Sequence, residues 1–291
     1  MIFRKYVIPV LAVAGVGLIG GSFCAALRRA GQVGRVIGVG RNPASLARAQ
    51  ELGLIDETMT AGDAAEAADL MLLATPVGAM PALLAQIAPR LRAHTVLTDG
   101  GSTKQDVIAA ARSGLGPRID RFVPGHPIAG SDESGPQAAD ADLYRGRSVV
   151  LTPLPENRAA DVDFVRRAWQ ACGAEVCQMP AAQHDTVLAS VSHLPHLLAF
   201  GYMAQVAACD DAALRLQHAG SGFRDFSRIA GSSSEMWRDI FLSNRDAVLR
   251  ELADVQATLD RMAALLQQGD GAALQAMIEA AAQARRNWRR E

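Results

Sequence analysis

Hydrophobic positions in the first 180 residues form short runs, and longer amphipathic segments separate them. We predict strands at residues 10–14, 35–39, 70–74, 95–98, 122–124, 148–152 and 175–178. We predict helices at residues 18–30, 44–52, 79–91, 104–111 and 156–172. This alternation is typical of repeated βα units, which form a mostly parallel sheet with helices on both faces. We expect the last strand to complete the same sheet.

The pattern changes at residue 181, where strand signals stop and helical spacing takes over. Long helices are predicted at residues 246–268 and 272–288, and the first has one continuous apolar face. That face is typical of an internal core or of a dimer interface. The sequence therefore predicts an α/β, Rossmann-like, doubly wound domain in residues 1–180 and an all-helical domain in residues 181–291.

Composition narrows the class of protein. The chain has 291 residues, of which 49% are hydrophobic and 20% charged, and this balance is typical of a globular protein with two packed domains. A net charge of −1 argues against nucleic acid or a membrane surface as a partner. The four cysteines form no CxxC pair, and glycines follow the N-terminal apolar run where a signal peptide would have its cleavage site. We expect a cytoplasmic protein.

A glycine-rich segment follows the first predicted strand. Gly15, Gly17 and Gly20, with Leu18 and Ile19 between the last two, form a GxGxxG motif that opens a helix. In dinucleotide-binding proteins these glycines form the tight turn, admit the pyrophosphate and let helix and strand pack closely. A glycine-rich βα turn without a ligand is the alternative, and the strand pattern that continues downstream favours the dinucleotide.

The residues after the second strand indicate which dinucleotide is bound. NAD-binding proteins usually carry an acidic residue there that binds the adenine ribose, and this chain has Gly40 and Arg41 instead. Arg41 can pair with the 2′-phosphate of NADP through charge-assisted hydrogen bonds. We therefore predict NADP as the preferred cofactor, with NAD as the alternative; Arg41 as a plain surface residue is the other interpretation.

Ligands of open parallel sheets lie beyond the carboxyl ends of the strands, so the residues just after each strand are candidates for chemistry. Thr75 and Pro76 follow one strand and are expected to contact the cofactor. His126 follows another, in a predicted loop, where an imidazole suits a general base near neutral pH. Ser102 precedes a predicted helix, and helix capping and substrate contact are both compatible with that position.

At this point a resemblance to a known family becomes specific. The chain resembles the prephenate/arogenate dehydrogenase family in the segments GVGLIGGS (15–22), ATPV (74–77), DGGSTK (99–104), GHPIAGSDESG (125–135), HDTVLASVSHLPH (184–196), GSGFRDFSRIA (220–230) and MWRDI (236–240). The resemblance implies a Rossmann-like domain, a helical substrate and dimerisation domain, and an active site between them. It implies oxidative decarboxylation of prephenate, arogenate or both with NAD(P), on the route to tyrosine.

The resemblance also implies roles for individual residues. His126 resembles the family's catalytic histidine, and Ser102 resembles the serine that supports it. Further positions resemble substrate-binding residues of the family: Arg228, which would hold a carboxylate, His196, Trp237 and Asp132. Two departures are the missing acidic residue after the second strand, which puts NAD in doubt, and Ser221, which stands where glycine is common.

The sequence argues against three alternative interpretations. A related Rossmann-plus-helical reductase would usually need a lysine in the helical domain, and no lysine occurs after Lys104. A dinucleotide-binding module without chemistry is disfavoured by the set of His126, Ser102 and Arg228. A metal site at His193 and His196 lacks a carboxylate or cysteine to complete it, so no metal is predicted. The preference between prephenate and arogenate stays open.

Overall fold

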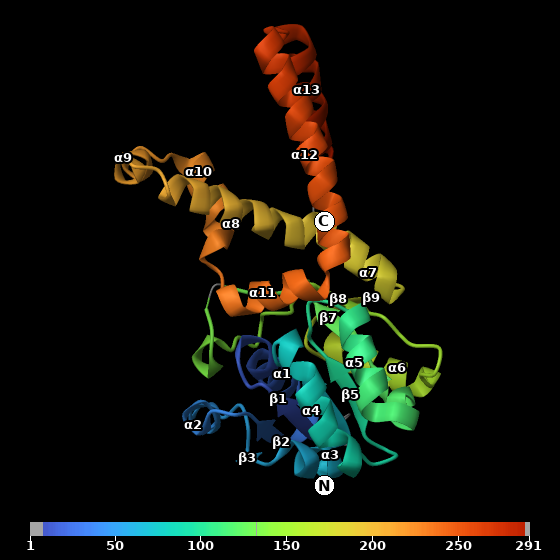
Figure 1. Cartoon of the computed structure of the whole chain (residues 1–291). Helices are drawn as coiled ribbons and strands as arrows, with labels where there is room; N and C mark the ends of the chain where they lie inside the picture. The colour runs from blue at the N-terminus through green and yellow to red at the C-terminus, as the bar shows by residue number, and fades with distance from the viewer. Residues whose placement is uncertain (1–7, 132, 289–291) are drawn as a thin grey trace. The chain divides into compact units, whose positions relative to one another are not determined.

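The computed structural model describes residues 8–131 and 133–288 (Figure 1). The chain divides into two compact units, the first ending at Arg245 and the second beginning at Asp246. The sheets and the first helices after them all belong to the first unit. The predicted domain boundary after residue 180 falls inside this unit and stays a prediction.

The main sheet has six parallel strands in the order β3-β2-β1-β4-β5-β6. The strands are β1 (Ile8–Ala14), β2 (Val33–Val39), β3 (Glu57–Thr58), β4 (Leu70–Leu73), β5 (Val96–Asp99) and β6 (Phe122–Val123). The chain runs outward from β1 to β3 and then crosses back to β4 on the other side of β1. This topology confirms the predicted Rossmann-like, doubly wound sheet.

Helices cover both faces of the main sheet (Figure 1). They are α1 (Leu18–Arg29), α2 (Pro43–Glu51), α3 (Ala61–Ala67), α4 (Met80–Ile87), α5 (Gln105–Leu115) and α6 (Ala159–Ala171), with short 3₁₀ turns η1 (Val77–Ala79), η2 (Ala88–Arg90), η3 (Gly116–Arg121) and η4 (Pro136–Ala138). One core joins α1 and α6, where the rings of Phe23 and Trp169 lie 4.5 Å apart. The other joins α3, α4 and α5. Each large side chain buried in these cores contributes about 1.5–3 kcal/mol.

A second sheet contains β7 (Gly125–Pro127), β8 (Ser148–Leu151) and β9 (Glu175–Gln178). The prediction that the strand at residues 175–178 completes the main sheet was wrong, and the strand predicted at residues 148–152 also lies in this second sheet. The predicted loop around His126 was also wrong, because His126 lies in β7 and pairs with Val150 in antiparallel register. The extended conformation that Pro127 favours at His126 is present. The segment becomes a strand because it pairs with β8, which follows about twenty residues later, and local sequence patterns do not predict pairing between such distant segments.

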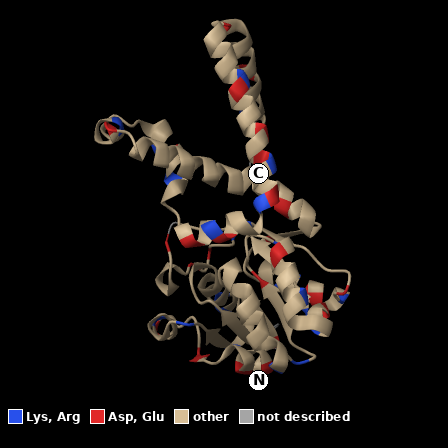
Figure 2. Cartoon of the chain, in the orientation of Figure 1, with Lys and Arg blue, Asp and Glu red and all other residues tan. Residues whose placement is uncertain are grey.

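Helices make up the rest of the first unit. They are α7 (Ala181–Leu188), η5 (Ala189–His193), which is a π-helical turn, α8 (Leu194–Ala207), α9 (Ala212–Gln217), α10 (Ser221–Ser227), η6 (Arg228–Gly231), a 3₁₀ turn, and α11 (Ser234–Ser243). The stretch Ala181–Ala207 is long and apolar enough to cross a membrane by length and composition alone, with a mean hydropathy of 1.2. Figure 2 shows how few charged residues α8 carries. Core helices of water-soluble proteins pass the same test, and three buried polar residues of this stretch have polar partners, namely His184, Asp185 and His193.

The second unit is a helical hairpin of α12 (Arg245–Gln268), whose first residue still belongs to the first unit, and α13 (Gly271–Asn287). Gly269 adopts a φ of +67° in the turn, which glycine tolerates without a steric penalty. The carboxylate of Asp270 accepts the backbone N–H of Ala273 and caps α13. Leu249, Leu259 and Leu266 on α12 are each more than half exposed, so part of the apolar face predicted from the sequence is uncovered in the single chain.

Candidate active site

The turn between β1 and α1 has the backbone geometry of a phosphate-binding turn. Gly15 has a φ of +92°, and a Cβ atom there would lie 2.4 Å from the Ala74 carbonyl oxygen. A Cβ at Gly20 would lie 2.1 Å from the Gly15 carbonyl oxygen, so both positions require glycine. A Cβ at Gly17, by contrast, would meet no described atom within 4 Å. This open side of Gly17 at the start of α1 leaves room for a pyrophosphate beside free backbone N–H groups.

The other predicted cofactor positions lie at the same edge of the sheet. Thr75 and Pro76 follow β4, directly beside Gly15. Gly40 and Arg41 follow β2, and both are exposed. Because β2 and β4 flank β1, these loops surround the turn that carries Leu18 and Ile19. The arrangement fits a dinucleotide, although the individual contacts stay predictions.

A buried ion pair supports the loop after β5. The Lys104 ammonium pairs with the Asp99 carboxylate, and both side chains are fully buried. Lys104 also donates to the Gly125 carbonyl oxygen at 2.6 Å, and the Gly125 N–H donates to Asp99 at 3.0 Å. Burial lowers the pKa of Lys104, while the charge of Asp99 opposes that shift. The pair therefore joins the loop that carries Ser102 to the strand that carries His126.

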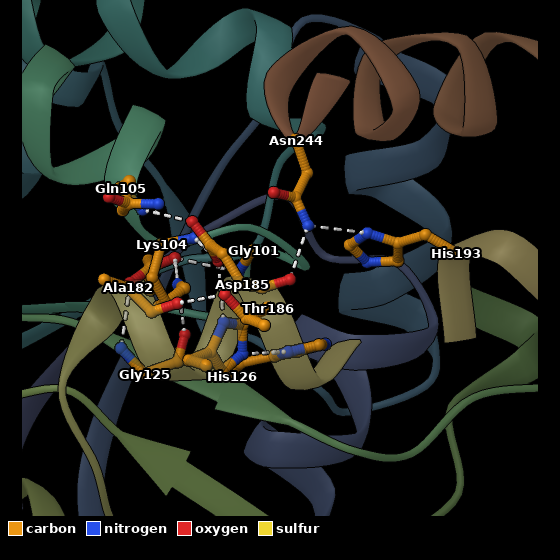
Figure 3. Close-up of polar contacts among 12 residues, drawn as sticks. Gly101, Lys104, Gln105, Gly125, His126, Ala182, Asp185, Thr186, His193 and Asn244 are labelled. Carbon is orange, nitrogen blue, oxygen red and sulfur yellow. Dashed lines mark hydrogen bonds and ion pairs between the residues drawn. The ribbon is translucent and has the colours of Figure 1, made fainter. Parts of the chain in front are cut away.

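His126 is 8% exposed and lies against α7 (Figure 3). Its Nδ1 is 2.8 Å from Nε2 of His184, and Nδ1 of His184 is 2.8 Å from a carboxylate oxygen of Asp185. Burial lowers the pKa of His126 well below that of a free imidazole, and the positive charge of nearby Lys104 lowers it further. His126 is therefore neutral at physiological pH, which is the state that a general base requires.

Ser102 is half-buried in the loop between β5 and α5. The interpretation of Ser102 as a helix cap was wrong, because the carboxylate of Asp185 caps α5 by accepting the backbone N–H groups of Lys104 and Gln105, each at 2.8 Å. The capping residue comes from α7, eighty positions along the chain from the helix that it caps. Substrate contact by Ser102 stays a prediction.

A second group of polar side chains adjoins Asp185 (Figure 3). The side-chain amide of Asn244 donates to the Asp185 carbonyl oxygen at 2.7 Å and lies 3.1 Å from Nδ1 of His193. Burial lowers the pKa of His193 to about 4. Among the described residues, Nε2 of His193 and Nε1 of Trp237 are buried without a hydrogen-bond partner. Buried polar atoms of this kind usually bind water or a ligand.

The predicted substrate-binding residues lie next to this group. The rings of His196 and Trp237 stack at 3.7 Å. Arg228 begins η6, which packs against α8, the helix that carries His196. Burial lowers the pKa of His196, and the positive charge of Arg228 adds to that effect. Asp132 lies outside the described residues. Sequence reasoning gave no role in the reaction to His184, Asp185, His193 or Asn244, although the first three lie in a segment that resembles the family.

Comparisons with known proteins agree with this geometry. The family model described as the nucleotide-binding domain of prephenate dehydrogenase matches residues 23–178, and that described as its dimerization domain matches residues 180–280. The chain belongs to the prephenate dehydrogenase family. The resemblance drawn from the sequence is therefore confirmed, and so is the presence of a nucleotide-binding domain. The glycine turn itself precedes the first matched residue.

Individual relatives cover nearly the whole chain. A cyclohexadienyl dehydrogenase of Zymomonas mobilis is 33% identical over 90% of this chain and 89% of its own length. The prephenate dehydrogenase of A. aeolicus, solved with hydroxyphenyl propionate and NAD+, superposes with a TM-score of 0.89 at 33% identity, covering 95% of this chain and 97% of that one. The arogenate dehydrogenase of Synechocystis superposes with a TM-score of 0.80 at 28% identity, over 95% and 98%.

Proposed function

We propose that this chain oxidatively decarboxylates prephenate, arogenate or both, with a nicotinamide cofactor, to 4-hydroxyphenylpyruvate or tyrosine. The chain is a member of the prephenate dehydrogenase family, and one observation carries the proposal. Polar and aromatic side chains lie next to one another within one compact unit, from His126 to the neighbours of Arg228. A neutral imidazole at one end and a guanidinium at the other suit a substrate that loses a proton and carries carboxylates. Neither the related reductase nor the dinucleotide-binding module without chemistry has an observation in its favour.

The chemistry assigns a task to each group. The glycine turn and the loops after β2 and β4 would hold the dinucleotide, which when bound accepts the hydride. His126 takes the proton of the ring hydroxyl, Ser102 orients that hydroxyl, and Arg228 holds a carboxylate. The stacked rings of His196 and Trp237 would form one wall of the substrate site. Loss of the ring carboxylate as carbon dioxide restores aromaticity, so deprotonation and hydride removal suffice to drive the reaction.

Steady-state rates test the proposal directly. The purified chain is assayed with prephenate and with arogenate, each with NAD+ and with NADP+, by following the absorbance of the reduced nicotinamide. We expect turnover with at least one of the four combinations. The absence of turnover with all four, in protein that binds a dinucleotide, would contradict the proposed activity.

We infer that NADP is the preferred cofactor. Arg41 and Gly40 are both exposed after β2, and Asn42 is occupied in capping α2 through the N–H groups of Ala44 and Ser45. Arg41 is therefore the side chain of this loop whose charge suits a 2′-phosphate.

Replacing Arg41 by alanine should raise the KM for NADP+ by about tenfold and change the KM for NAD+ little, because a charge-assisted hydrogen bond contributes about 1.5 kcal/mol or more. Arg48→Ala, on the same loop-helix segment but paired with Glu51, is the control. An equal KM change for both cofactors would disprove the phosphate contact.

Arg228 is proposed as the carboxylate anchor. In Arg228→Ala we expect the KM for the substrate to rise by about 10- to 100-fold, with a smaller change in kcat, because a charged hydrogen bond to the substrate is lost. Arg224→Ala, one helical turn earlier, is the matched control. If Arg224→Ala carries the KM effect and Arg228→Ala does not, the anchor has been assigned to the wrong arginine.

The assembly proposed is a homodimer formed through the helical domain, residues 181–291. The description of the second matched family model as a dimerization domain supports it. So do the exposed apolar residues of the hairpin, such as Leu259 and Leu266, because contiguous exposed apolar surface commonly marks an interface. A small-molecule substrate, a cytoplasmic location and the lack of nucleic-acid or membrane partners complete the hypothesis.

A further inference from the structure

Behind His126 lies a pair of buried residues that the proposed reaction does not yet use. His184 is fully buried and Asp185 is 1% exposed, both on α7. The rings of His126 and His184 meet edge to face at 5.1 Å, and a hydrogen bond of 2.8 Å joins them. A second hydrogen bond of the same length joins His184 to Asp185. The three side chains thus form a continuous chain that ends at a carboxylate.

The direction of these two hydrogen bonds follows from the surroundings of Asp185. The Asp185 carboxylate accepts hydrogen bonds from the backbone N–H groups of Lys104 and Gln105. Burial raises the pKa of Asp185, but these two hydrogen bonds and the one from His184 outweigh burial, so the pKa is lowered. An ionised carboxylate can only accept hydrogen bonds, so Nδ1 of His184 carries a hydrogen. With that single hydrogen on the His184 ring, its Nε2 has a lone pair, which accepts a hydrogen from Nδ1 of His126.

The tautomer of His126 is thereby determined as well. Neutral His126 carries one hydrogen, and with that hydrogen on Nδ1 its Nε2 is an unprotonated acceptor. The hydrogen bond that the His126 ring makes among the described residues engages Nδ1 and leaves Nε2 available to substrate. An imidazole without this support favours the other tautomer in water, with the hydrogen on Nε2, and that tautomer cannot take a proton there.

We propose that His184 and Asp185 are positioning residues that hold His126 in the tautomer with a basic Nε2 and stabilise the imidazolium that forms during the reaction. The inference rests on the proposed role of His126 as the base. The substrate O–H bond breaks, its electrons remain to form the carbonyl, and the proton forms a new N–H bond at Nε2. The resulting positive charge lies two hydrogen bonds from the Asp185 carboxylate.

The surroundings make this support specific to His184. The other charged or titratable groups that face His126 are Lys104, from the loop before α5, and His193, from η5. Lys104 is an ammonium held by Asp99, and His193 shares Asn244 with the backbone of Asp185. Neither provides an acceptor to Nδ1 of His126, which His184 alone contacts among the described residues.

Two substitutions of His184 separate hydrogen bonding from packing. In His184→Gln, the side-chain oxygen can occupy the place of Nε2 and accept the same hydrogen. In His184→Leu, the volume is retained and the acceptor is lost. We expect kcat to fall by about 10²-fold in His184→Leu and by less than about tenfold in His184→Gln, with the dinucleotide Kd unchanged in both. His94→Leu, which alters an exposed imidazole, is the control and should leave kcat unchanged.

Nitrogen NMR of ¹⁵N-histidine-labelled protein gives a readout that does not depend on activity. His126→Asn assigns the His126 signals. We expect the hydrogen of His126 on Nδ1 in the wild type and in His184→Gln, and on Nε2 in His184→Leu.

A hydrogen on Nε2 in the wild type, or an unchanged tautomer and kcat in His184→Leu, would overturn the inference. If the NMR pattern is as expected while the wild type turns over neither prephenate nor arogenate, the positioning of His126 stands and the proposed function fails. The two failures are therefore distinguishable.

Discussion

Replacing His126 by asparagine is expected to reduce kcat by about 10²- to 10⁴-fold, which is the usual contribution of a general base. Asparagine keeps a polar group of similar reach at Nδ1 but has no lone pair that can take a proton at neutral pH. The Kd of the dinucleotide should stay nearly unchanged, because the glycine turn that would bind it lies on other loops. Stopped-flow or steady-state rates with the preferred substrate, and cofactor titration by fluorescence, measure both quantities.

The pH profile adds a second check on His126. Because burial and the positive charge of neighbouring Lys104 hold the pKa of His126 well below 6.5, the free enzyme retains the neutral base as the pH falls through 6.5. We therefore expect kcat/KM to stay level there and to fall only at more acidic pH, where the folded-state imidazole finally takes a proton. Near-normal rates in His126→Asn would refute the assignment of the base.

Breaking the buried ion pair of Lys104 and Asp99 is expected to lower the stability of the fold more than breaking an exposed ion pair. Lys104→Met leaves the Asp99 carboxylate buried without its counter-ion, and breaking such a pair costs about 3–5 kcal/mol in the free energy of unfolding. The change also removes the bond to the Gly125 carbonyl, so β7 should lose support beside His126. Urea denaturation followed by circular dichroism measures the loss.

A double variant separates the effect of the unpaired buried charge on stability from the effect of lost packing. In Lys104→Met with Asp99→Asn, neither residue of the pair leaves a buried charge, and the loss should be smaller than in Lys104→Met alone. Arg112→Met, which breaks an exposed ion pair with Glu156, is the control and should change stability by no more than about 1 kcal/mol. A loss below about 1 kcal/mol in Lys104→Met would show that the pair has little role in stability.

The main sheet was predictable because its information is local. Apolar runs and helical spacing located β1, β2, β4 and β5, and the glycine pattern located the turn after β1. The two-residue strand β3 was missed because so short a segment leaves no periodicity to detect. The second sheet was assigned to the wrong layer, because strand pairing is a contact between distant segments.

The site was predictable only where residue type and position carried the signal. His126 was found through its place after a strand, although the expected loop is a buried strand. The roles of His184 and Asp185 were missed, because they depend on α7 packing against the start of α5, and sequence spacing does not record that contact. Asn244 was missed for the same reason, since it reaches Asp185 from the end of α11.

The convergence of base and anchor on one substrate is tested most directly by a crystal structure of the complex with the dinucleotide and a hydroxyphenyl product analogue. We predict the ring oxygen about 3 Å from Nε2 of His126 and a carboxylate on the guanidinium of Arg228. An analogue bound with its ring oxygen away from His126, or with its carboxylates held by residues other than Arg228, would contradict the account.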